Sequence, residues 1–324
     1  MIDYEACPQE LRDFLTYLEV IKGKSPNTVQ AYYYDLQLFY RYFKIKNTPS
    51  LTLGDIEKLS ISDVPFRWIE QIRLSDLYEF MSYVNQKRAN SSSARARKVS
   101  CLRTYFKYLT NKANLLKVDP SLELDSPKIG KRLPKYLDLD GSMDILHAAE
   151  DLNQRDFCML TLLLNCGLRV SELVGINRTD IRGNQLKVVG KGDKERQIFL
   201  NDACIQALEA YLPTRPKAKA AAENALFLNN RNERMGVRGV QLLVKKYLKL
   251  AGLDSKTYST HKLRHTAATL MYRYGKVDVL ALQKILGHES LATTQIYTHT
   301  DDEQIKDAMN SNPLADYNKK TPSR

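Results

Sequence analysis

The most informative part of the sequence reads His261-Lys262-Leu263-Arg264-His265, then Leu286-Gly287-His288, then Thr293-Thr294-Gln295-Ile296-Tyr297-Thr298-His299. Four of the chain's five histidines lie in these three segments. Clustering of this kind indicates a functional site. Metal binding, ordinary packing and phosphate chemistry are the three explanations to weigh.

Metal binding is the first explanation. His261 and His265 are four residues apart, so on a helix they share one face, as the paired histidines of zinc sites do. The glutamate that acts as general base in HExxH enzymes is missing, and Arg264 stands between the two histidines. A permanent cation next to a divalent ion costs energy. We therefore expect no metal and no other cofactor.

Packing alone explains most single histidines and tyrosines, and with 19 tyrosines no single one stands out. Phosphate chemistry explains the cluster better, because Arg264 presents a fork of donors that matches phosphate oxygens and His261 can donate to or accept from a neighbouring oxygen.

The segment 286–288 is typical of a helix end with glycine just beyond it, which would fix the imidazole of His288 in a turn. Ser290 is typical of the N-cap of a short helix that carries Tyr297. A phenol with a pKa near 10 needs positioning and an electrophilic phosphorus to act as a nucleophile.

In this order, H-x-x-R at 261–264, LGH at 286–288 and TTQIYTH at 293–299 resemble the active-site signature of the tyrosine recombinases, within the Xer and phage-integrase family. The ordered set is highly specific, although its parts are not. The resemblance implies that Tyr297 attacks a DNA phosphodiester. Arg264 and His288 would then stabilise the charge on phosphorus, and His261 would serve as base or hydrogen-bond partner of the phenol.

A second arginine lies upstream, in the segment Gly167-Leu168-Arg169-Val170-Ser171-Glu172-Leu173. The nearly all-apolar residues 154–166 predict a buried helix that stops at Gly167. An arginine emerging there is expected to meet a buried anion or to pair with a carboxylate such as Glu172. The resemblance implies that Arg169 is the first catalytic arginine and that Glu172 supports the site from behind it.

A lysine completes the set. Residues 185–200 alternate in the manner of a β-hairpin, and Lys191 lies between two glycines at its turn. A lysine in a turn is usually just solvated, but this one resembles the family's β-hairpin lysine. The resemblance implies that Lys191 is the acid for the leaving 5′-oxygen, with Lys194 as the neighbouring alternative.

Length and charge limit what the protein can be. A chain of 324 residues is long enough for two domains, and its net charge of +12 predicts a polyanionic partner, nucleic acid before membrane surface. No apolar run approaches the roughly 20 residues that span a bilayer, and the acidic residues 1–5 do not resemble a signal peptide. The five cysteines are scattered and form no CxxC motif, so we expect reduced core residues in a cytoplasmic protein with no membrane partner.

One helix is expected to contact DNA. Between Glu79 and Asp119 the sequence contains no acidic residue. A helix is predicted over about 94–110, after possible N-caps at 91–93. A basic run is usually a solvated face, but a segment this long without a balancing carboxylate favours DNA binding. The residues expected to meet DNA are Arg95, Arg97, Lys98 and Arg103.

The segment 125–134 has the proline, glycine and charge of an exposed linker, so we expect domains at 1–126 and 127–324. Further helices are predicted over about 8–22, 26–44, 75–88, 140–150, 203–212 and 237–252. The expected fold is mainly α: a helical core DNA-binding domain, then a mostly helical α/β catalytic domain with a small β-hairpin sheet. By resemblance, residues 303–318 would dock onto a neighbouring subunit.

The resemblance implies a site-specific recombinase that joins DNA through a 3′-phosphotyrosyl link and needs neither ATP nor metal. Its partners would be a double-stranded recombination site and either further copies of the chain, as a dimer on one site and a tetramer in synapsis, or a related recombinase. The two-domain form favours Xer-type chromosome dimer resolution over integration and excision of a mobile element. A type IB-like topoisomerase and a DNA-binding protein without catalysis remain as alternatives.

Overall fold

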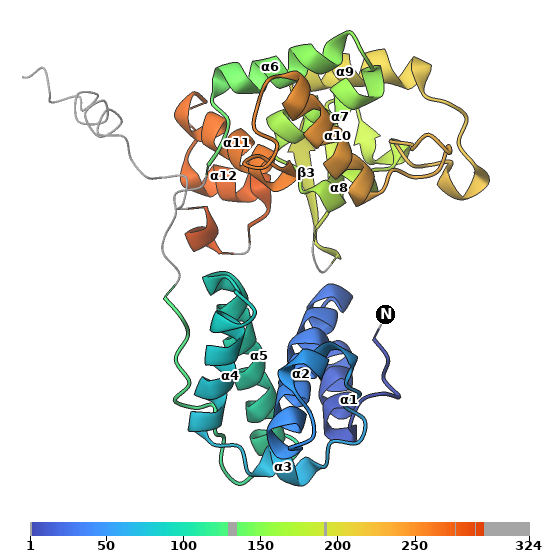
Figure 1. Ribbon diagram of the computed structural model, residues 1–324. Coiled ribbons are helices and arrows are strands. Elements are labelled where there is room, and N and C mark those ends of the chain that lie inside the picture. The colour runs from blue at the N-terminus through green and yellow to red at the C-terminus, as the bar shows by residue number, and fades with distance from the viewer. Residues whose placement is uncertain (1, 129–134, 191–192, 276, 289, 295–324) are drawn as a thin grey trace, which may run out of the picture. The chain divides into compact units, whose positions relative to one another are not determined.

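The computed structural model describes residues 2–128, 135–190, 193–275, 277–288 and 290–294. The chain divides into two compact units, Met1–Lys131 and Arg132–Arg324 (Figure 1). This division falls five residues beyond the boundary expected from the linker composition. Each unit has a hydrophobic core of its own.

Helices and turns, with no strands, make up the described residues of the first unit. Its elements are α1 (Gln9–Thr16) with a π-helical turn (Tyr17–Ile21), α2 (Pro26–Asn47), a 3-10 turn (Leu53–Lys58), α3 (Phe66–Glu70), α4 (Leu74–Gln86) and α5 (Ser92–Asn111). Serine caps fix where two helices begin: Ser25 Oγ accepts the N–H of Thr28, and Ser91 Oγ accepts that of Ala94. Helix α5 packs against α1, α2 and α4, so the basic helix is also a core helix.

The second unit is built around α7. Its elements are α6 (Leu139–Glu150), α7 (Gln154–Cys166), α8 (Val170–Gly175), a 3-10 turn (Arg178–Asp180), β1 (Ile181–Arg182), β2 (Gln185–Val189), β3 (Glu195–Phe199), α9 (Asp202–Tyr211), 3-10 turns at Leu212–Thr214 and Ala220–Ala222, α10 (Val237–Leu250), α11 (Thr260–Arg273), α12 (Val279–Leu286) and a 3-10 turn (Leu291–Thr293).

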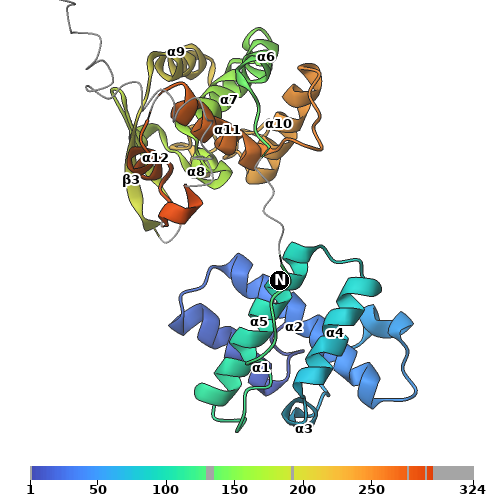
Figure 2. The ribbon, with the colours of Figure 1, turned by 90° about the vertical axis from the view of Figure 1, so that its left-hand side faces the viewer.

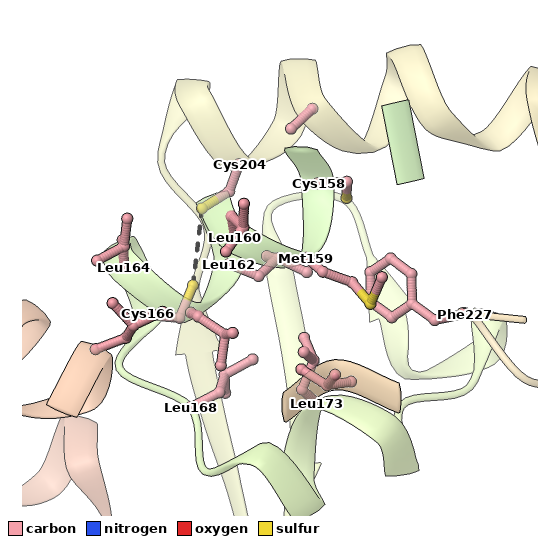
Figure 3. Close-up of a cluster of buried hydrophobic side chains, with 14 of the residues drawn as sticks. Cys158, Met159, Leu160, Leu162, Leu164, Cys166, Leu168, Leu173, Cys204 and Phe227 are labelled. Carbon is pink, nitrogen blue, oxygen red and sulfur yellow. Dashed lines mark hydrogen bonds between the residues drawn. The ribbon is translucent and has the colours of Figure 1, made fainter. Parts of the chain in front are cut away.

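Helix α7 carries apolar side chains on all of its faces, and it is therefore buried among other elements. It packs against α6, α8, α9 and α11, and Met159, Leu160 and Leu162 are fully buried (Figure 3). Near its end, Cys166 Sγ lies 3.7 Å from Cys204 Sγ of α9. All five cysteines are free and buried, as their scattered spacing predicted.

Two glycines in the left-handed region end helices α7 and α12. Gly167 has φ +60° and Gly287 has φ +63°, and both helix ends were predicted from these glycines. A Cβ on Gly167 would lie 2.8 Å from Cδ2 of Leu286. The end of α7 therefore lies directly against the end of α12, although the two segments are far apart in sequence.

The sheet is antiparallel, in the order β1-β2-β3, with Leu186 opposite both Ile181 and Ile198. The predicted hairpin is confirmed, and its turn is closed by the N–H of Gly190 donating to the carbonyl of Lys194 at 2.8 Å. Strand β3 lies beside α12 (Figure 2), in agreement with a hydrogen bond between them from Arg196 to Ile285.

The expected fold class is confirmed: mainly helical, with one small antiparallel sheet in the second unit. Three short elements, α3, α8 and β1, were not predicted because each is too short to show a period in the sequence. Within the described residues, no helix has both the length and the apolar character needed to cross a membrane.

Candidate active site

The site is centred on Glu172, in the first turn of α8. Its side chain is 1 % exposed. One carboxylate oxygen accepts the backbone N–H of Arg169 and the other accepts its Nη1, both at 2.8 Å. Arg169 therefore pairs with Glu172, one of the two partners expected from the sequence, while its side chain remains 35 % exposed.

A further arginine, Arg196 on β3, binds the same carboxylate. Its Nη1 donates to Oε1 of Glu172 at 2.7 Å, its Nη2 donates to Oε2 at 2.9 Å, and its Nε donates to the carbonyl of Ile285 at 2.9 Å. Burial alone would raise the pKa of Glu172, but the hydrogen bonds from Arg196 and from the Arg169 N–H outweigh it and hold the pKa below its ordinary value.

Sequence reasoning missed Arg196. A signal existed: residues 196 and 198 share one face of the strand, and Ile198 is buried. An arginine in the core-facing register of a short strand needs a buried partner.

Arg264, on α11, lies beneath this carboxylate and is 3 % exposed. Its Nη1 donates to the carbonyl of Gly167 at 2.7 Å and its Nη2 to that of Leu286 at 2.6 Å. These are carbonyls at the ends of α7 and α12, which have no partner within their helices. Nη1 also lies 3.7 Å from Oε2 of Glu172. Three guanidinium groups therefore surround one carboxylate.

His288 follows the end of α12. Its Nδ1 lies 2.9 Å from Oγ1 of Thr294, and its carbonyl accepts from Gln283 Nε2 at 3.1 Å. Ser290 stands at the N-cap of the 3-10 turn Leu291–Thr293, but its side chain makes no capping bond, and Tyr297 of the expected helix lies outside the described residues. Burial, followed by the charges of Arg264 and Arg169, lowers the pKa of His288 to about 4.

His261 and His265 face each other on α11, with their Nε2 atoms 3.1 Å apart. Burial, then Arg264, lowers the pKa of His261, and burial, then His261, lowers the pKa of His265 to about 4. The guanidinium of Arg264 is buried and donates to the carbonyls of Gly167 and Leu286. Among the described residues, no group of three or more His, Cys, Asp or Glu side chains is placed to hold a metal ion.

We expect the imidazoles of His265 and His288 to be neutral at pH 6. The unfolded chain binds their protons near pH 6.5, whereas the folded chain binds them only near 4, so the unfolded state holds more protons between these values. Stability should therefore fall as the pH drops through this interval. Histidine ring signals followed by NMR, assigned with His265→Gln and His288→Gln, would measure it. Titration of either ring near pH 6.5 in the folded chain would contradict the expectation.

Arg169 and His288 line a cavity of about 520 Å³ next to this cluster. The remaining lining residues are Gly190, Lys194, Glu195, Arg196, Lys284, Gly287, Ser290 and Thr293. One acidic side chain stands among five basic or imidazole groups, so the wall favours an anion. Arg264 lies behind this wall. Lys191 and Tyr297, like residues 303–318, lie outside the described residues.

The four residues expected to meet DNA all lie on α5, but the structure separates them. Lys98 is buried and its Nζ lies 2.5 Å from Oδ1 of Asp35, so its expected contact with DNA is not possible in this conformation. The register of the helix turns this position inward, beside Val99. Arg97 binds Asp35 and the Ala31 carbonyl while its side chain stays 43 % exposed.

The other two differ in exposure, since Arg95 is half-buried and Arg103 is exposed. Arg95 donates to Asn85 and to the Asn90 carbonyl, and Arg103 is exposed. A second basic face, on α10, was missed although it carries the same signal: no acidic residue occurs between Glu233 and Asp254. Its exposed cations are Arg238, Lys245, Lys246 and Lys249.

Comparison with known proteins agrees with this geometry. The model of the phage integrase family matches residues 135–304, and that of the phage integrase N-terminal SAM-like domain matches residues 11–61. The tyrosine recombinase XerC of Caldanaerobacter subterraneus subsp. tengcongensis is 50 % identical over 95 % of this chain and 88 % of its own. The tyrosine recombinase XerD of Proteus mirabilis is 37 % identical over 91 % of this chain and 90 % of its own.

Among solved structures, the XerH site-specific recombinase bound to palindromic difH substrate shares the fold, with a TM-score of 0.68 at 22 % identity over 87 % of this chain and 79 % of that one. The family models and the close relatives together cover both units. The chain therefore belongs to the phage integrase family, as a tyrosine recombinase of the Xer type.

Proposed function

We propose that the protein is a site-specific DNA recombinase that cuts and rejoins DNA through a 3′-phosphotyrosyl intermediate, with Tyr297 as the nucleophile. The observation that carries the proposal is the cluster of three arginines around the buried carboxylate of Glu172, next to a cavity that Arg169 and His288 line. Positive charge held rigidly beside a cavity is suited to the charge that develops on phosphorus.

The proposed chemistry has one bond formed and one broken. The phenolic oxygen of Tyr297 bonds to phosphorus, and its proton passes to His261. The bond from phosphorus to the 5′-oxygen breaks, and Lys191 supplies the proton that this oxygen takes up. Arg169, at the cavity wall, and Arg264, behind it, offset the charge on the phosphoryl oxygens, and His288 donates to one of them.

A reversible covalent link keeps the energy of the phosphodiester bond, so a second strand's 5′-hydroxyl can reverse the step without ATP. The relatives are XerC and XerD recombinases, which favours Xer-type resolution of chromosome dimers over a mobile-element role. In this proposal the protein works in the cytoplasm on a double-stranded site. It binds as a dimer on one site and a tetramer in synapsis, with copies of itself or with a related recombinase.

Covalent capture tests the function. Duplexes drawn from the host genome, each nicked next to the cleavage position so that the cut fragment escapes, should trap the chain as an adduct seen on a denaturing gel. Peptide mapping should place the adduct on Tyr297, and a chelator should leave the yield unchanged. Adduct on another residue, or a reaction that the chelator abolishes, would overturn the proposal. Relaxation of plasmids without a specific site would favour a topoisomerase, and binding without any adduct would favour an inactive DNA-binding protein.

Arg103→Gln tests the DNA-binding face of α5. Each exposed cation that meets a phosphate releases about one counterion, so the variant should bind DNA more weakly and show a salt slope smaller by roughly 1. Fluorescence anisotropy at several salt concentrations measures both. Arg67→Gln on α3 is the matched control, because Arg67 is also exposed in the first unit. Equal loss in both variants would show that total charge, and not this face of α5, governs binding.

A further inference from the structure

We propose that Arg196 is a positioning residue for DNA cleavage, which fastens β3 to both Glu172 and the end of α12 and thereby fixes Arg169 and His288 together. This inference rests on the proposed function and names a residue that its chemistry did not use.

The contacts of Arg196 occupy all three nitrogens of its guanidinium. Nη1 and Nη2 donate in parallel to the two carboxylate oxygens of Glu172, and Nε donates to the carbonyl of Ile285. A planar fork with five donors makes this arrangement, whereas the single ammonium of lysine cannot reach both partners with the same geometry. The side chain is only 13 % exposed, so water competes weakly for these bonds.

The first consequence concerns Arg169. Its Nη1 shares Oε1 of Glu172 with Nη1 of Arg196. The carboxylate is thus clamped from β3 on one side and oriented toward Arg169 on the other. Without Arg196, a buried carboxylate would have only Arg169 and the more distant Arg264 to balance it, and its rotamer would no longer be fixed.

The second consequence concerns His288. Gly287 is the residue before it, and a Cβ built on Gly287 would lie 3.0 to 3.2 Å from Cδ, Nη1 and Nε of Arg196. The side chain of Arg196 therefore packs closely against the turn that leads to His288, and a side chain at position 287 would crowd it. Arg169 Nη2 donates to the carbonyl of the same glycine at 3.1 Å, so both arginines contact the turn at Gly287.

The third consequence concerns the hairpin. Arg196 pairs with Val188 across the β2–β3 ladder, close to the turn that carries Lys191 in sequence. The strand that leads away from this turn is thus anchored through Arg196 to α8 and α12. Catalysis requires the reacting groups to be placed accurately, and hydrogen bonds from supporting residues keep them in that position.

Arg196→Lys and Arg196→Gln in the full chain test the role. We expect DNA affinity within about twofold of wild type, and a single-turnover rate of adduct formation at saturating DNA lower by roughly 10- to 100-fold for lysine, as the loss of a supporting hydrogen-bond partner costs at other sites. Arg215→Lys is the matched control. It is another half-buried arginine of the second unit whose Nε and Nη2 bind backbone carbonyls, but it lies away from the cavity. Its rate should be unchanged.

The pH profile adds a readout that a merely structural role would not move. Removing Arg196 takes away the strongest influence that opposes burial at Glu172, so the pKa of this carboxyl rises. Cleavage by Arg196→Gln should therefore fail at a higher pH than cleavage by the wild type as the pH is lowered. With Glu172→Gln as the background, the chains with and without Arg196→Gln should lose cleavage at the same pH, because position 172 no longer titrates.

The outcomes separate clearly. A wild-type rate in both Arg196 variants would overturn the inference. A loss of DNA affinity as large as the loss of rate would also overturn it, because Arg196 would then be a direct DNA contact. Failure of the proposed function would look different: the wild-type chain itself would form no adduct.

Discussion

A chain that carries Tyr297→Phe is expected to bind its DNA site with unchanged affinity and to form no covalent adduct above background. Phenylalanine keeps the ring but lacks the oxygen whose bond to phosphorus makes the intermediate. Loss of a catalytic nucleophile lowers the rate by roughly 10⁴-fold or more in other enzymes that use covalent catalysis. Adduct on nicked duplexes and strand exchange between two labelled sites are the measurements, and both should be lost together.

Tyr274→Phe is the matched control for this experiment. Tyr274 ends α11 and is 66 % exposed, so removing its hydroxyl should alter neither adduct nor exchange. Strand exchange by the Tyr297→Phe chain would show that the nucleophile is another residue. Loss of DNA binding along with the adduct would show that the phenol acts in recognition and not in bond formation.

The parts of this site that could be predicted from sequence are those that local chemistry fixes. A glycine just beyond an apolar helix predicted the ends of α7 and α12, and both glycines have the left-handed backbone that such an end requires. Serine before a helix predicted where α2 and α5 begin. Each signal lies within a few residues of the feature that it specifies.

The parts that could not be predicted depend on contacts distant in sequence. Arg169 reaches the carbonyl of Gly287 across 118 residues, and Arg196 reaches Glu172 and Ile285 from a third segment. Composition and periodicity give the face on which a side chain lies, but not the partner that it meets there. The recombinase signature supplied Arg169 and Arg264, whereas Arg196 stands outside that signature and was missed.

Lys98 shows the opposite error. Counting charges along residues 80–118 treats every cation as available, yet one of them faces the core, where Asp35 balances it. Val99 and Leu102 on the same helix are buried as well. A helix that packs on three others has a wide buried face, so a position next to a core residue can itself be buried, and a basic helix offers DNA fewer cations than its sequence contains.

Arg264→Lys is expected to have the second largest effect, because this arginine joins two roles. It donates to the carbonyl of Gly167, just beyond α7, and to the last carbonyl of α12, and it places a charge 3.7 Å from Glu172. Lysine keeps the charge, but its single ammonium can donate well to only one of the carbonyls of Gly167 and Leu286 and leaves the other without a partner. A buried acceptor left unsatisfied costs about 1–3 kcal/mol, and for a domain of this size each kcal/mol lowers the melting temperature by roughly 2–4 °C.

The rate of cleavage should fall further than stability alone requires, by roughly 10²- to 10³-fold, as it does when one preorganised donor to a developing negative charge is lost. Calorimetry and single-turnover adduct formation, both at a temperature where the variant is fully folded, separate the two effects. Arg155→Lys is the control, since Arg155 also donates to a buried carbonyl, that of Leu228, but at the opposite end of α7. If both variants lose stability and only Arg264→Lys loses cleavage, the guanidinium beneath the cavity acts on the phosphate. If cleavage survives in both, Arg264 serves only to hold the two helix ends together.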